Sequence, residues 1–336
     1  MAAPAPGSRE WLDLIREPII DPDRPIVDPH HHLWRRPNFD YLLDDLWADT
    51  ETGHNVEKTV FVECRACYRE AGPEQLRCVG ETEFVRELAE ASRRDPDKAT
   101  IAAIVGHADL TLGDAVEEVL DAHEAAGGGL FRGIRHAGAR DPHPQALTIP
   151  GRAPEGLYAD PDFRSGLTRL GAVGFSYDTW HYHHQNRAFA DLARAVPRTT
   201  MILDHFGTPL GVGPYADRRE EIYEQWREDI VEIAACPNVV AKLGGLAMPD
   251  NGFGWDKETA PPTSDDFVAA QARYYLHTID AFGPERCMFE SNFPVDKRSL
   301  SYPVLYNGLK KIAARFSEAE QHALFYGTAA RVYRLD

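Results

Sequence analysis

Short apolar runs rich in Val, Ile and Phe recur along the chain, separated by longer stretches whose apolar residues follow helical spacing. Runs of this length and β-branched content are typical of buried strands. The eight runs cover residues 25–28, 58–63, 99–106, 130–135, 172–177, 200–205, 239–243 and 287–291. The periodicity between them predicts helices within residues 84–91, 115–123, 189–196, 222–233 and 267–282. A final helix is expected to start at Ser317, which forms a capping-box pair with Glu320.

The alternation of strands and helices predicts a parallel sheet of the α/β class. Eight such units can close into a single-domain (β/α)8 TIM-type barrel, which we expect over residues 25–336, after an N-terminal arm at 1–24. An open, doubly wound sheet is the alternative, but no Gly-x-Gly-x-x-Gly motif follows the first run. Two Pro- and Gly-rich excursions, 136–161 and 248–264, follow strands on the face where barrel active sites lie. They are candidate substrate loops or lids.

The sequence Asp-Pro-His-His-His at residues 28–32 is the strongest chemical signal. Side chains along a strand alternate between its faces, so Asp28, His30 and His32 are expected to point the same way. If that face is the barrel interior, the imidazoles of His30 and His32 could chelate one divalent cation. A chance run of His in a capped loop is the alternative interpretation.

Polar and ionisable side chains end several of the other runs: Glu63, Arg135, His136, His205, Lys242, Glu290 and Asn292. In a parallel barrel the carboxyl ends of all strands meet at one rim, and this rim carries the active site. The distribution therefore predicts a catalytic centre at that rim.

Four motifs and the chain's last helix together resemble the amidohydrolase superfamily, in the branch of lactonases that includes 2-pyrone-4,6-dicarboxylate lactonase. Each motif is weak alone, but their order and their placement at strand ends are similar to that family from about residue 25 to 335. The matching segments are 26–32, Leu-Asp-His-Phe-Gly at 203–207, Val-Ala-Lys-Leu-Gly-Gly at 240–245, Phe-Glu-Ser-Asn-Phe-Pro at 289–294, and 325–333.

The resemblance implies that His30, His32 and His205 are ligands of a divalent metal such as zinc, or polarise a substrate carbonyl in a metal-free enzyme. It also implies that Arg135 binds a substrate carboxylate, because a guanidinium fork matches a planar anion. Lys242 and His136 are further candidate substrate contacts.

The strand-eight run departs from the family pattern. Asn292 stands where the family has the Asp that activates water, and an amide cannot take a proton at neutral pH. Glu290, two residues earlier on the same strand face, is one candidate base, and Glu63 is the other. Burial near other carboxylates could raise the pKa of either into a useful range. A buried Glu paired with Arg or Lys is the alternative interpretation of Glu290.

The end of strand five is rich in aromatic and His residues, from Tyr177 to His184, and resembles the family's pocket loop before Gln185. Tyr177 and His181 are candidate substrate contacts. His183 and His184 are expected to begin a surface helix.

Two enzymatic functions follow from the resemblance. The first is hydrolysis of a lactone or a related carboxylated cyclic ester; the second is a non-hydrolytic lyase, a decarboxylase or hydratase, acting on a small aromatic or cyclic acid. A barrel that only binds a ligand is disfavoured by the intact His30, His32 and His205.

The composition limits the partners. A net charge of −17 opposes binding to nucleic acid, so a small, carboxylated molecule is the expected partner, and a homo-oligomer is compatible with the sequence. We expect a cytoplasmic protein, because no apolar run could span a bilayer and the first ten residues lack the apolar segment of a signal peptide. Five cysteines, with Cys64-x-x-Cys67 lacking a second pair, indicate free thiols rather than a disulfide framework or a structural zinc site.

Overall fold

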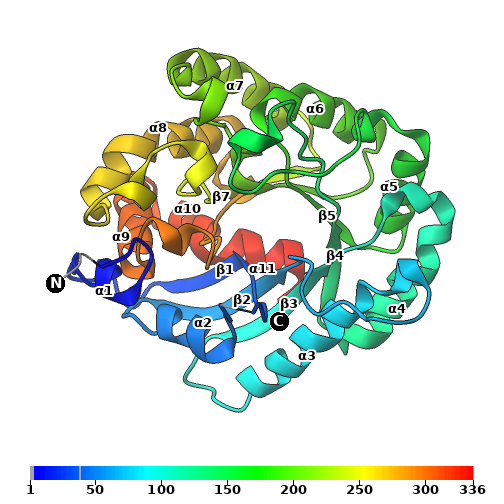
Figure 1. The fold of residues 1–336 in the computed structure, drawn as a ribbon, viewed down its shortest axis with the longest axis horizontal. Helices are drawn as coiled ribbons and strands as arrows, with labels where there is room; N and C mark the ends of the chain where they lie inside the picture. Colours follow the sequence, from blue (N-terminus) through cyan, green and yellow to red (C-terminus); the bar gives the residue numbers. More distant parts are fainter. Residues whose placement is uncertain (1–3, 38, 336) are drawn as a thin grey trace.

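The computed structural model describes residues 4–37 and 39–335. Eight parallel strands form one sheet in the order β1 to β8, surrounded by helices (Figure 1). The predicted single-domain TIM barrel is therefore confirmed. The strands are β1 (Pro25–His31), β2 (Asn55–Val62), β3 (Thr100–Gly106), β4 (Phe131–Arg135), β5 (Ser176–Thr179), β6 (Met201–Leu203), β7 (Val239–Leu243) and β8 (Cys287–Phe289).

The barrel closes where the end of β1 meets the segment after β8. The backbone N–H of His32 donates to the carbonyl of Phe293 at 2.8 Å, and that of Asn292 donates to the carbonyl of His30 at 2.9 Å. These bonds join the first and last strands at the rim that carries the candidate chemistry, and they fix His30 relative to the residues after β8.

The helices are α1 (Arg9–Leu12), α2 (Leu43–Thr50), α3 (Val79–Ser92), α4 (Glu117–Gly127), α5 (Pro161–Ala172), α6 (Asn186–Ala195), α7 (Arg219–Ala234), α8 (Ser264–Phe282), α9 (Tyr302–Ala313), α10 (Glu318–His322) and α11 (Thr328–Tyr333). Ser317 caps α10 as predicted, but a π-helical turn at Ala323–Gly327 separates α10 from α11. The fifth strand begins at Ser176 rather than at residue 172, because Asp160 and Pro161 start α5, which runs to Ala172.

The barrel interior is filled by small and branched apolar side chains. α11 lies across the barrel in Figure 1, and its Ala329 and Tyr333 pack with the interior residues. A larger apolar cluster fills the layer between the strands and the outer helices. The interior residues are Val27, Val60, Val62, Ala103, Val105, Ile202, Val240 and Met288.

Tyr333 connects α11 to charged groups inside the barrel. Its hydroxyl donates to Oδ2 of Asp178 at 2.7 Å, and its ring centroid lies 5.3 Å from Nζ of Lys242. Tyr333 and both charged side chains are fully buried. The last helix therefore provides a hydrogen bond to a carboxylate that water cannot reach.

The two excursions and the N-terminal arm pack on one another. The Asp250 carboxylate accepts hydrogen bonds from the backbone N–H groups of Thr148 and Ile149, at 2.6 and 2.9 Å, which joins the second excursion to the first. In the arm, the buried Trp11 donates its indole N–H to the carbonyl of Glu258. Across the part of the chain that is described, none of the helices has both the length and the apolar content to cross a membrane.

Replacing Tyr333 with Phe removes the hydroxyl that donates to Asp178. We expect the free energy of unfolding to fall by about 1–3 kcal/mol, because a buried carboxylate loses a partner. Tyr275→Phe is the matched control: in the part of the chain that is described, the buried Tyr275 hydroxyl has no hydrogen-bond partner, so its removal should be neutral or stabilising. Urea denaturation of both variants checks the difference, and equal losses would show that the Tyr333 bond contributes nothing.

Candidate active site

The carboxyl ends of seven strands bring one cluster of buried polar side chains together. β1 supplies His30, β7 supplies Lys242, and the remaining members stand at or just after the ends of β2, β4, β5, β6 and β8. We call these residues the rim cluster: His30, Glu63, Arg135, Asp178, Asp204, His205, Lys242 and Glu290. The most exposed of them, Arg135, has only 7% of its surface accessible.

Glu290 lies between two imidazoles at the centre of the rim cluster. Its Oε2 is 2.8 Å from Nδ1 of His30, and its Oε1 is 2.7 Å from Nδ1 of His205. Burial raises the pKa of Glu290 to about 8, and burial lowers the pKa of His205 to about 3 and that of His30 well below its usual value. Both imidazoles are therefore neutral near pH 7, and Nδ1 of each ring lies next to a different oxygen of the carboxyl group.

His30 and the neighbouring His32 have further polar partners. Nε2 of His30 accepts from Nη1 of Arg135 at 3.3 Å. His32 donates its Nδ1–H to the carbonyl of Val62 at 2.8 Å, which leaves its Nε2 as an acceptor. The His30 and His32 rings meet edge to face with their centroids 5.0 Å apart. The predicted association of these two histidines is thus present.

Asp28 does not share their surroundings, so the prediction that it points the same way is wrong. The pairing of β1 with β2 shifts register between Asp28 and His31, which breaks the strict alternation of faces. The Asp28 carboxylate accepts from the backbone N–H of Ser291 at 2.9 Å and from the hydroxyl of Tyr302 on α9 at 3.1 Å. Asp28 therefore ties β1 to α9 and to the segment after β8.

A left-handed turn after β6 presents Asp204 and His205. His205 and Phe206 have φ angles of 53° and 58°, so the chain reverses immediately beyond the strand. The Gly-Gly pair after β7 makes room for this turn. A Cβ on Gly245, which has φ of 75°, would lie 2.3 Å from Nδ1 of His205, and one on Gly244 would lie 2.4 Å from Cγ of Glu290. This close approach gives a physical reason for the Gly-Gly motif.

Two permanent cations balance part of the negative charge. Nζ of Lys242 donates to Asp178 at 2.6 Å and lies 3.4 Å from Asp204. Nε of Arg135 donates to Glu63 at 2.9 Å, and its Nη1 lies 3.7 Å from Asp204. The cluster thus holds four carboxyl groups against two cations, and burial raises the pKa of Asp204 to about 7.

The rim cluster fits a divalent metal ion. His30, Asp204 and His205 each offer one ligand atom, and the three atoms lie within 4.8 Å of one another. Among the described residues, neither oxygen of Asp204 has a hydrogen-bond partner, and the excess of carboxyl groups over cations would be balanced by a divalent charge. Two imidazoles and one carboxylate are a ligand set that zinc accepts, with a position left for water. His32, predicted as a ligand, lies outside this group of three.

Other predicted residues make their polar contacts elsewhere. The Asn292 amide donates to Asp296 at 2.8 Å, within the loop after β8. The Tyr177 hydroxyl donates to the carbonyl of His136 at 2.8 Å, and the Tyr177 ring packs in the outer apolar layer. Asn292 thus supports its own loop, and the Tyr177 hydroxyl holds the backbone after β4.

The two remaining predicted histidines are also held by neighbouring loops. Nδ1 of His136 accepts from the backbone N–H of Leu110 at 3.1 Å. His181 is fully buried between the Asn186 amide oxygen, 2.9 Å from Nε2, and the Tyr158 hydroxyl, 3.2 Å from Nδ1. Their roles as substrate contacts stay predictions.

Asp204 and Asp178 are cluster members that the sequence analysis did not select. Both were recognisable, because Asp204 directly precedes His205 and Asp178 stands at the end of strand five. All five cysteines are free thiols.

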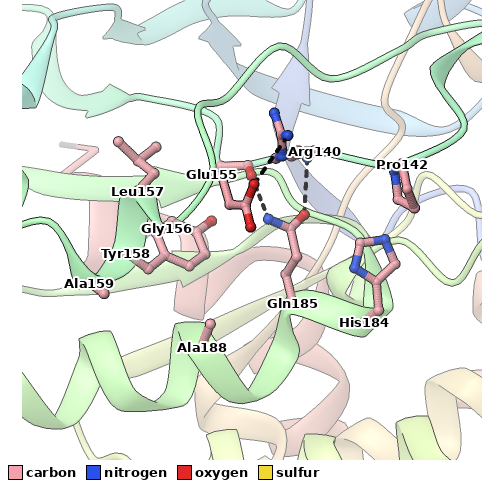
Figure 2. A pocket seen from close by; sticks show the side chains of 11 residues that line it. Arg140, Pro142, Glu155, Gly156, Leu157, Tyr158, Ala159, His184, Gln185 and Ala188 are labelled. Carbon is pink, nitrogen blue, oxygen red and sulfur yellow. Dashed lines mark hydrogen bonds and ion pairs between the residues drawn. The ribbon is translucent and has the colours of Figure 1, made fainter.

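A separate surface pocket of about 410 Å³ lies beside the first excursion and the start of α6 (Figure 2). The backbone N–H of Arg140 donates to the Gln185 side chain at 3.1 Å, and the Arg140 guanidinium lies 3.4 Å from Glu155. Tyr158 also lines the pocket and connects it to His181. The excursion thus has a pocket of its own, lined by both polar and apolar residues outside the rim cluster.

Gly245→Ala is expected to disturb His205 and to lower the midpoint of thermal unfolding. The added Cβ meets Nδ1 of His205, and the left-handed φ adds strain of about 1–3 kcal/mol. Gly254→Ala is the control, because Gly254 has a φ of 79° but open space around its Cβ position. If the midpoint of thermal unfolding falls equally in both variants, the contact between the added Cβ and His205 has no effect on stability.

Residues 27–335 match the sequence model of the amidohydrolase family. The chain is 32% identical to the uncharacterized protein y4mH of Sinorhizobium fredii, over 93% of this chain and 99% of that one. It is 29% identical to an L-fucono-1,5-lactonase of Burkholderia multivorans, over 92% of this chain and 96% of the lactonase. A solved amidohydrolase structure from B. multivorans with bound zinc has a TM-score of 0.71 at 28% identity, covering 93% of this chain and 99% of that one.

The pyrone-dicarboxylate branch is more distant than the sequence analysis indicated. A putative 2-pyrone-4,6-dicarboxylic acid hydrolase from Pseudomonas putida is 17% identical with a TM-score of 0.62, which shows a shared fold alone. The lactonases that resemble this chain more closely carry the L-fucono-1,5-lactonase name. The family match, which spans nearly the whole barrel, shows that this chain belongs to the amidohydrolase family.

Proposed function

We propose that this protein hydrolyses the lactone of a sugar acid, or a related cyclic ester, to the open-chain hydroxy acid. The observation that carries the proposal is Glu290, a carboxyl group with a pKa of about 8, held between the imidazoles of His30 and His205 at the catalytic rim. The similarity to L-fucono-1,5-lactonases over 92% of the chain supports the choice of a lactone.

Glu290 is the proposed proton-transfer group. A general base works best when its pKa lies near the working pH, and burial brings that of Glu290 to about 8. Glu290 would take a proton as water adds to the lactone carbonyl, forming the new C–O bond. It would return the proton to the ring oxygen as the ester C–O bond breaks. The products are one hydroxyl group and one carboxylic acid on the same molecule, and the acid ionises by releasing a proton to solvent.

The other members of the rim cluster would stabilise the negative charge on the carbonyl oxygen. Arg135 directs Nη1 toward His30 and Asp204, and preorganised cations in a water-poor site lower the energy of an oxyanion. Its Nε and Nη2 atoms already bond Glu63, so its fork is not free for a substrate carboxylate. This favours a lactone without an additional carboxylate over a pyrone dicarboxylate.

Where a metal is bound, we propose that His30, Asp204 and His205 hold it, and that it polarises the carbonyl and lowers the pKa of water. Lys242, bonded to Asp178 and close to Asp204, would then set the orientation of Asp204. The two excursions remain the candidate substrate loops.

The decisive experiment is a proton-release assay over a panel of sugar lactones that includes L-fucono-1,5-lactone. We expect turnover by the wild type and a loss of about 10²–10⁴-fold in kcat for Glu290→Gln, the range of general acid–base catalysis. Glu87→Gln, on the exposed face of α3, is the control and should leave kcat unchanged. An unaffected Glu290→Gln variant would transfer the role of base to Glu63. Inert lactones together with CO2 release from an aromatic acid would establish the lyase instead.

Metal content is expected to depend on the three ligands. Protein produced with zinc supplied should retain about one zinc ion per chain, because neutral imidazoles and an ionised carboxylate bind it together. His30→Ala and Asp204→Asn should each lower the zinc content after dialysis, whereas the exposed His143→Ala should not. Elemental analysis of the dialysed proteins is the measurement. Equal zinc in all four proteins would place the ion elsewhere.

A further inference from the structure

The amino end of the barrel, opposite the rim cluster, carries a pocket of about 430 Å³ lined by five arginines. We call it the basal pocket. Its arginines come from the start of β4, the turns before β6 and β8, and the last helix with the residue after it. They are Arg132, Arg198, Arg286, Arg331 and Arg334.

Four of these arginines have no ion-pair partner among residues 4–37 and 39–335. Within residues 4–37 and 39–335, no carboxylate lines the basal pocket. Over the same ranges, four of its arginines have no carboxylate oxygen within the 4.0 Å of an ion pair: Arg198, Arg286, Arg331 and Arg334.

Backbone carbonyls hold several of the guanidiniums in place. Arg286 donates to the carbonyl of Ala234 at 2.9 Å, Arg334 donates to that of Gly174 at 2.9 Å, and Arg331 donates to that of Glu285. These bonds orient the side chains without neutralising them. Arg198 is exposed and extends from the turn between α6 and β6.

The five arginines form a positive cluster on a chain whose net charge is −17. Other arginines pair with acids, as Arg273 does with Glu220 and Arg194 with Glu232. Several guanidiniums facing one cavity repel one another unless an anion lies between them. Guanidinium forks match carboxylate and phosphate groups, and Ser176 and Thr200 add polar side chains to the lining.

We propose that the basal pocket binds a small polyanion that carries phosphate or carboxylate groups. Its volume lies in the range of small-molecule sites. A ligand there would bridge α11 to the strands, because Arg331 and Arg334 flank Tyr333 while Arg198 and Arg286 belong to the strand side. The proposal is independent of the reaction at the opposite rim.

The test titrates the full-length protein with inorganic phosphate and, separately, with citrate at low ionic strength, using calorimetry. We expect saturable binding of at least one anion, weakened about tenfold or more by Arg198→Gln and by Arg331→Gln, since each removes a charged donor. Arg94→Gln, an exposed arginine at the end of α3, is the control for net charge and should bind like the wild type. Citrate can also chelate a metal at the rim. The measurement is therefore the difference in anion affinity between the pocket variants and Arg94→Gln.

The two anions distinguish the two chemical classes of ligand that the basal pocket could bind. Binding of phosphate alone assigns the basal pocket to a phosphorylated ligand, and binding of citrate alone assigns it to a polycarboxylate. No saturable binding of either anion, or an equal loss in Arg94→Gln, overturns the proposal. Circular dichroism of the variants excludes misfolding, and Arg198 is suited to the test because its side chain makes no hydrogen bond within the described residues.

Discussion

The contact of Glu290 with the two imidazoles of His30 and His205 constrains much of the barrel's upper end. A carboxyl group that is removed from water loses several kcal/mol of hydration, so the surrounding structure must return hydrogen bonds and charge. The strand pairing beyond β8 brings His30 to one oxygen, and the left-handed turn after β6 brings His205 to the other. The Gly-Gly pair after β7 is small enough to admit both groups.

The same constraint explains why charged groups extend down into the barrel. Glu290 and Asp204 need compensation that solvent cannot supply, and Lys242 provides it from the neighbouring strand. A buried lysine requires its own partner, which is Asp178, and Asp178 in turn accepts from Tyr333. A chain of polar groups thus runs from the catalytic rim to the last helix, surrounded by apolar side chains of the barrel interior.

Much of this organisation could be predicted from the sequence, because it follows from local pattern. The strand runs and the polar residues at their ends placed Glu63, Arg135, His205, Lys242 and Glu290 at one rim. The orientation of Asp28 could not be predicted, since a register shift overrides simple alternation.

Tertiary contacts account for the remaining differences. The hydroxyl of Tyr177 donates to the backbone after β4, outside its own strand, whereas the amide of Asn292 bonds Asp296 within its own loop. The guanidinium of Arg135 looked free for a substrate, but its Nε and Nη2 atoms both bond Glu63. The position of a residue along the chain predicts which end of the barrel it lies at. The hydrogen-bond partner of its side chain depends on how the surrounding segments pack.

Tyr333 also links the last helix to the electrostatics of the catalytic rim. Its hydroxyl donates to Asp178, Asp178 accepts from Lys242, and Lys242 lies 3.4 Å from Asp204. If α11 moved away from the barrel, water would reach Asp178 and Lys242 and would screen the charges that act on Asp204. A substitution in α11, which contacts no substrate, would therefore change the charge balance at the rim.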